Sequence, residues 1–147
     1  MALLSPADEQ RLRDFFSEMT SRVRLLFFTQ TFDCEMCPQT RQILDELPPL
    51  SDKISVEEVN FVLERDRAAR YGIDRVPAVA FEQLDDEGNT TDARIRFIGT
   101  PSGYEFMSLV QAALLVGGRP SALSEENRQR IVAVNQPIHM QVFTTPT

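Results

Sequence analysis

The sequence predicts an α/β domain whose central mixed four-stranded sheet is flanked by helices. Two observations lead to this class. Apolar runs of strand length alternate with segments of helical period along the chain, and the last two strands are joined by one short polar turn. A strand–helix–strand unit followed by a hairpin and a helix combines parallel and antiparallel pairs in one sheet.

The first half of the chain shows clear boundaries. Ser5 and Pro6 predict a helix start, since serine caps a helix and proline suits its first turn, and apolar spacing extends this helix over roughly 6–20. Residues 23–29 form a nearly continuous apolar run, which predicts a strand covered on both faces. The next helix must stop near Leu47, because two prolines follow it.

The second half follows the same rules and ends in additional elements. Further strands are expected at 53–60, 76–82 and 94–99, and further helices at 62–71, from 102 to about 116, and from 124 to about 134. The first helix and the last one are additions to the compact βαβ–ββα order, and an additional strand is expected at 138–143. The prediction is therefore one sheet domain with an N-terminal helix and a C-terminal helix and strand attached.

Composition excludes several functional classes. The 147 residues carry a formal net charge of −7 and include 2 Cys and 1 His. An acidic chain without a broad basic face is a poor nucleic-acid binder. No apolar run approaches the roughly 18 residues of a membrane span, and no secretory signal is visible at the start. We therefore expect a cytoplasmic protein that binds neither nucleic acid nor membrane.

The two cysteines, Cys34 and Cys37, lie between a predicted strand and a predicted helix. The free N–H groups and the positive dipole end of that helix would stabilise a thiolate on Cys34. Cys34 would then attack a disulfide and Cys37 would resolve the mixed disulfide, with Pro38 suiting the first turn. No metal or organic cofactor is expected, since the dithiol itself carries two electrons. A structural disulfide, or a zinc half-site completed by His139 and carboxylates, are the alternatives.

Neighbours of the cysteines suggest how the site is tuned and reached. Glu35 would oppose a thiolate on Cys34 and make the couple more reducing, unless solvent screens it. Phe32 and Met36 flank the cysteines and predict an apolar surface on which a substrate chain docks. Tyr71 and Tyr104 lie at predicted helix ends, where their hydroxyls are expected to point to solvent instead of bordering the redox site.

The segment Cys34-Glu35-Met36-Cys37-Pro38, together with Val76-Pro77 before the third main strand, resembles the thioredoxin fold. That resemblance implies a cis Val76–Pro77 bond facing the disulfide, with the Val76 backbone available to an extended substrate segment. One departure is plain. Residues 23–28 contain no carboxylate where thioredoxins bury an aspartate. Deprotonation of Cys37 then relies on water or on another acid, for which Glu58 is a candidate.

The whole chain is similar to the first half of the glutaredoxin-like protein disulfide oxidoreductases, which carry two thioredoxin-fold units in tandem. The stretch 99–106, Gly-Thr-Pro-Ser-Gly-Tyr-Glu-Phe, adds to the likeness, and in that family a segment similar to 141–147 leads to a second C-x-x-C. This resemblance divides the chain into a unit at 1–135 and the opening strand of a truncated second unit at 136–147. We expect self-association through 138–143, because a lone apolar strand is an association site.

The resemblance implies a thiol–disulfide oxidoreductase that acts on protein disulfides and serves cell redox homeostasis. Glutathione mixed disulfides are a second substrate class, and a thioredoxin-reductase-like flavoprotein is the expected reductant. Two alternatives stay open. One is an electron-relay domain similar to the N-terminal domain of the alkyl hydroperoxide reductase flavoprotein, which typically keeps its cysteines in the second unit. The other is a non-catalytic thioredoxin-like interaction module.

Overall fold

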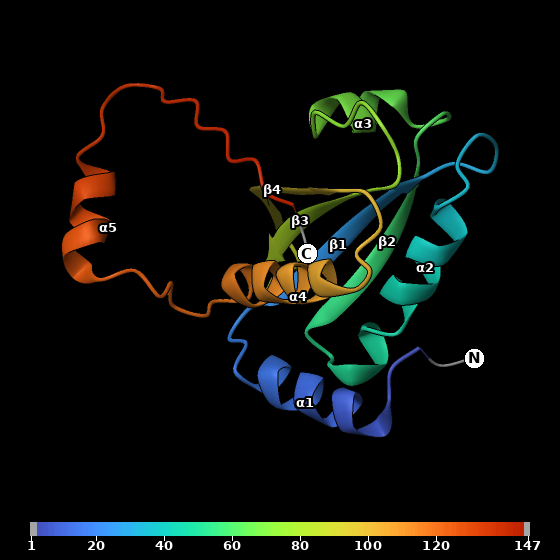
Figure 1. Cartoon of the computed structure of the whole chain (residues 1–147), viewed down its shortest axis with the longest axis horizontal. Helices are drawn as coiled ribbons and strands as arrows, with labels where there is room; N and C mark the ends of the chain where they lie inside the picture. The colour runs from blue at the N-terminus through green and yellow to red at the C-terminus, as the bar shows by residue number, and fades with distance from the viewer. Residues whose placement is uncertain (1–2, 146–147) are drawn as a thin grey trace.

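The computed structural model describes residues 3–145 and contains one four-stranded sheet with helices on both faces (Figure 1). Its elements, in chain order, are α1 (Pro6–Ser17), β1 (Arg22–Thr29), α2 (Cys37–Asp45), the 3-10 turn η1 (Pro48–Leu50), β2 (Ile54–Asn60), α3 (Arg65–Arg70), β3 (Ala78–Leu84), β4 (Thr90–Ile98), α4 (Tyr104–Val116) and α5 (Glu125–Val132).

The strand order is β2-β1-β3-β4. β1 pairs in parallel with β2 and antiparallel with β3, and β3 pairs antiparallel with β4. The predicted mixed sheet is therefore confirmed. Because β1 and β2 are parallel, their C-terminal ends lie at the same end of the sheet, where the chain turns toward α2. The residues that follow these two strands therefore lie close together at that end.

Strand β1 separates two apolar clusters, because successive side chains point to opposite faces. Val23, Leu25 and Phe27 pack in the larger cluster with residues of α1, α4 and the end of α2. Leu26 and Phe28 pack in the smaller cluster, which α3 covers. Burial on both faces explains why β1 is nearly continuous in apolar residues.

Two predicted boundaries are wrong for local reasons. The helix expected from residue 62 begins only at Arg65, because the Asn60 side-chain oxygen accepts the N–H groups of Val62 and Leu63 and holds a turn there. β4 begins at Thr90 instead of residue 94, because Asp85 closes the preceding turn and Thr90 then pairs with Leu84.

The strand expected at 138–143 does not form. Its backbone is irregular and its large apolar side chains are exposed, with Val142 at 78% and Phe143 at 88%. Neither edge of the sheet, β2 or β4, pairs with it, and an unpaired strand has no ladder of hydrogen bonds to stabilise it. The expected helix α5 does form, but it has no buried residue. In Figure 1 it lies apart from the sheet, and the segment after it runs back in the direction of β4. The proposed start of a second unit at residue 136 stays a prediction, with 146 and 147 outside the described residues.

Within residues 3–145, no helix has both the length and the apolar character that crossing a membrane requires.

Candidate active site

The two cysteines form a disulfide at the start of α2, with their Cα atoms 5.4 Å apart. Residues 30–36 carry the chain from the end of β1 to this point, and the backbone N–H of Cys37 donates to the carbonyl of Cys34. Cys37 is buried at 3% exposed, whereas Cys34 is only half-buried. Cys34 is therefore the more accessible of the two cysteines.

The first turn of α2 is suited to a negative charge on Cys34. Its N-cap residue, Met36, makes no side-chain capping bond, and the first turn contains no acidic residue. The first N–H groups of a helix have no partner within the helix, and the dipole places partial positive charge there. Pro38 occupies the first turn, as expected, where its missing N–H costs nothing. Glu35 is exposed to solvent.

Pro77 lies at the entry of β3 and is buried, and its peptide bond with Val76 is cis. Its carbonyl accepts the N–H of Gly99 at 2.9 Å. Gly99 has φ +111°, a left-handed backbone that favours glycine, so the sequence stretch beginning at Gly99 turns sharply beside the proline. Val76 itself is half-buried and packs against the smaller apolar cluster.

A pair of threonine hydroxyls connects this proline segment with the cysteine helix. Thr40, fully buried in α2, donates to the Met36 carbonyl at 2.9 Å and lies 2.9 Å from the hydroxyl of Thr100. Thr40 has one hydroxyl proton, so the proton between the two threonines belongs to Thr100. Sequence reasoning missed both residues. The available signal was a threonine in the first turn of the C-x-x-C helix.

Beside Cys37, a hollow opens between the start of α2 and the ends of β1 and β2. It is lined by Thr29, Gln30, Thr31, Cys37, Pro38, Arg41, Glu58 and Asn60. Glu58 forms an ion pair with Arg41, which lies one turn after Cys37. Glu58, the candidate acid for Cys37, thus lines the same hollow as that cysteine.

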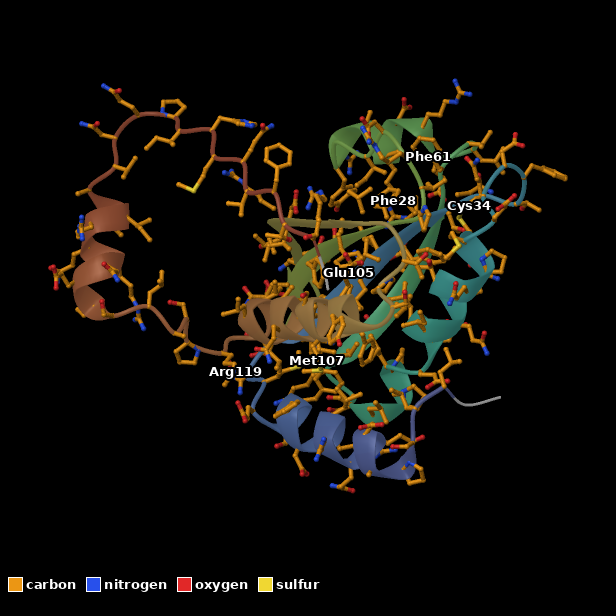
Figure 2. All side chains as sticks on the ribbon, viewed as in Figure 1. Phe28, Cys34, Phe61, Glu105, Met107 and Arg119 are labelled. Carbon is orange, nitrogen blue, oxygen red and sulfur yellow. A yellow bond between two sulfur atoms is a disulfide. The ribbon has the colours of Figure 1, made fainter. Side chains whose placement is uncertain are left out.

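The two side chains that were predicted to form an apolar docking surface, Phe32 and Met36, are exposed to solvent. Phe32 is 81% exposed and Met36 45%, and the turn after β2 adds Val62 at 49% and Leu63 at 81%. The N–H of Phe61 donates to the carbonyl of Thr29 at 2.8 Å, which fixes this turn beside the end of β1. Figure 2 shows Phe61 and Cys34 at the same end of the sheet. We call Phe32, Met36, Val62 and Leu63 the apolar collar.

A buried ionic group lies under α3, on the face of the sheet opposite α2. Glu82 is 1% exposed, and its carboxylate accepts from Arg24 at 2.6 Å and from the Tyr71 hydroxyl. The expectation that the Tyr71 hydroxyl points to solvent is therefore wrong, because a buried carboxylate needs donors. Burial, and then the hydrogen bond to Glu82, raise the pKa of Tyr71 to about 12. This group stabilises the domain without reaching the disulfide.

The fold and the cysteine pair together define a thioredoxin-like disulfide oxidoreductase. No protein-family model matches the chain. A probable thioredoxin from Methanothermobacter thermautotrophicus is 31% identical over 78 residues, which cover 52% of this chain and 80% of that protein. The chain belongs to the thioredoxin family.

Two solved structures extend the likeness. The NTD_N/C domain of the alkylhydroperoxide reductase AhpF from Enterococcus faecalis is 32% identical, with a TM-score of 0.78 over 90% of this chain and 62% of that one. A protein disulfide oxidoreductase from Aeropyrum pernix K1 shares the fold, at 20% identity and a TM-score of 0.72 over 88% of this chain and 54% of that one. The chain thus spans between half and two thirds of the length of either structure.

Proposed function

We propose that the chain exchanges two electrons with disulfide bonds of other proteins, with Cys34 as the attacking and Cys37 as the resolving residue. The observation that carries this assignment is the difference in exposure between the two sulfur-bearing residues, at a helix start that lacks a capping side chain. No metal or organic cofactor takes part in the proposed reaction.

The exchange proceeds in two displacements. The Cys34 thiolate attacks one sulfur of a substrate disulfide, forms a mixed disulfide and releases the other substrate sulfur as a thiolate. Cys37 then loses its proton and attacks the Cys34 sulfur, which releases the second substrate thiolate and restores the disulfide of the chain. The substrate gains two electrons, and the two cysteines lose them.

The substrate docks on the apolar collar. A disulfide inside a protein chain arrives with its flanking residues, and exposed apolar side chains around the redox sulfur favour such contacts. The Val76 backbone, next to the cis-proline, pairs with the extended substrate segment in the manner of an added strand. Protein disulfides are therefore the preferred substrate over small disulfides such as that of glutathione.

A flavoprotein dithiol restores the reduced form of the chain. This part of the proposal is supported by the similarity to a domain of alkylhydroperoxide reductase AhpF. The same similarity favours a second candidate, in which the chain relays electrons between a flavoprotein and one dedicated partner. The proposed compartment is the cytoplasm, where protein dithiols are kept reduced.

Reduction of insulin by dithiothreitol tests the proposal. The chain is expected to accelerate insulin precipitation, and Cys34→Ser to remove the acceleration. Cys37→Ser is expected to accumulate a covalent adduct with insulin, visible by mass spectrometry without reductant, because the mixed disulfide forms and is not resolved. A rate equal to that of dithiothreitol alone would contradict a general protein-disulfide activity. Reduction by a flavoprotein reductase without insulin activity would favour the relay candidate.

A further inference from the structure

Two oppositely charged side chains line the hollow beside the buried Cys37. The volume of the hollow is about 280 Å³, enough for several water molecules. Among the described residues that line it, Arg41 and Glu58 are the charged ones, and Cys37 is the remaining titratable one. The role inferred below for this pair rests on the proposed function.

Glu58 reaches the hollow because of its register in β2. It lies opposite Phe27 of β1, on the same face as Ile54, which packs in the cluster that includes residues of α2. Arg41 comes from α2 itself, four residues after Cys37, and therefore on the same side of the helix. The two side chains are 49% and 47% exposed, for Arg41 and Glu58 respectively, so water reaches the pair.

Cys37 needs a proton acceptor when it attacks the mixed disulfide. Its thiol is buried, and an ordinary thiol with a pKa near 8.5 is largely protonated at neutral pH. The one ionisable residue of 23–28, Arg24, points to the other face of the sheet and pairs with Glu57 and Glu82. On the α2 face, Glu58 is the carboxylate that shares a hollow with Cys37.

We propose that Glu58, through a water molecule in this hollow, accepts the proton of the Cys37 thiol during resolution. The S–H bond of Cys37 breaks, and its electron pair forms the bond to the Cys34 sulfur. The bond between Cys34 and the substrate sulfur breaks, and the substrate leaves as a thiolate with that electron pair. Glu58 then passes the proton to solvent. Arg41 positions the carboxylate through their ion pair.

A stopped-flow reaction of the reduced chain with dithiobis-nitrobenzoate separates the two displacements. The first phase releases one thionitrobenzoate as Cys34 attacks, and the second releases another as Cys37 resolves. Glu58→Gln is expected to slow the second phase by about tenfold or more at pH 7 and to leave the first unchanged. The difference should shrink as the pH is raised, because hydroxide then removes the thiol proton in place of Glu58.

Two further variants make the test specific. Glu58→Asp keeps a carboxylate and is expected to retain most of the second-phase rate, while Glu126→Gln, on exposed α5, makes the same charge change away from the site and should alter neither phase. A normal second phase in Glu58→Gln would overturn the role of Glu58. Equal slowing of both phases, with no rescue by Glu58→Asp, would overturn it as well. Absence of both phases in the unaltered chain would instead overturn the proposed function.

Discussion

The hydroxyl oxygens of Thr40 and Thr100 lie 2.9 Å apart, although the residues are 60 positions apart in the sequence. Thr40 lies one turn after Cys37, and Thr100 follows Gly99, whose N–H donates to the Pro77 carbonyl. These contacts connect the helix that carries the resolving cysteine to the proline segment. A pair of neutral side chains therefore links the two parts of the site.

Thr100→Val tests this connection, because valine has nearly the same shape and lacks the hydroxyl. The variant is expected to lower the free energy of unfolding by about 1 kcal/mol, the usual contribution of one such hydrogen bond. Urea titration measures the change. Thr91→Val, at an exposed position of β4, is the matched control and should have a smaller effect. Equal losses in the two variants would show that the Thr40 contact contributes nothing.

The apolar collar predicts a difference between large and small substrates. Changing Phe32 and Leu63 together to serine should raise the KM for insulin by about tenfold, since loss of one or two apolar contacts costs on the order of 1.5 kcal/mol. The reaction with dithiobis-nitrobenzoate, which does not span the collar, should keep its rate. Phe143→Ser provides the control, because that aromatic side chain is 88% exposed but lies on the C-terminal segment. Parallel losses for both substrates would contradict a docking role.

Tyr71→Phe removes a donor from the buried Glu82 carboxylate. Leaving a buried acceptor with fewer partners costs about 1–3 kcal/mol, so the variant is expected to unfold at lower urea concentration at neutral pH. Insulin reduction by the folded variant should be unchanged, because this group lies on the face of the sheet away from α2. A variant as stable as the unaltered chain would argue that Arg24 alone satisfies Glu82.

The same tyrosine predicts a pH dependence at the alkaline end. Its pKa is raised in the folded chain to about 12, above an unfolded value near 10. The stabilisation from the protonated hydroxyl is therefore complete below pH 10 and is lost as the pH rises through 12. Urea titrations at pH 9 and near pH 12 should show the unaltered chain losing more stability than Tyr71→Phe. Identical losses would mean that other groups govern alkaline unfolding.

The exposed apolar side chains near the C-terminus still predict self-association. Ile138, Met140, Val142 and Phe143 are each at least 67% exposed. Burying them between copies would remove apolar surface from water, so the sedimentation coefficient is expected to rise with protein concentration. Removal of 136–147 should abolish that dependence. Sedimentation that is the same before and after removal would contradict the prediction.

Several features could be predicted from the sequence because their signals are local. The alternation of apolar runs and helical period gave the four strands and the helices, and the cysteine spacing gave the redox pair and its placement at a helix start. Phe32 and Met36 were expected at the surface because they flank those cysteines. The strand expected at 138–143 does not form, because strand formation depends on partners distant in the sequence. An apolar segment becomes a strand only where the edge of a sheet can pair with it.

Only the tertiary structure determined the contacts between residues that are distant in the chain. The Thr40–Thr100 pair, the turn that adds Val62 and Leu63 to the collar, and the hollow shared by Glu58 and Cys37 all depend on which strand lies beside which and in which register. The hydrogen bond from Arg24 to Glu82, which lies 58 positions later in the sequence, depends on the same strand pairing. The sequence by itself determined the fold class and the chemistry of the dithiol, since both follow from short-range patterns. The surroundings that tune this dithiol were decided by packing, which brings together side chains whose spacing in the sequence carries no pattern.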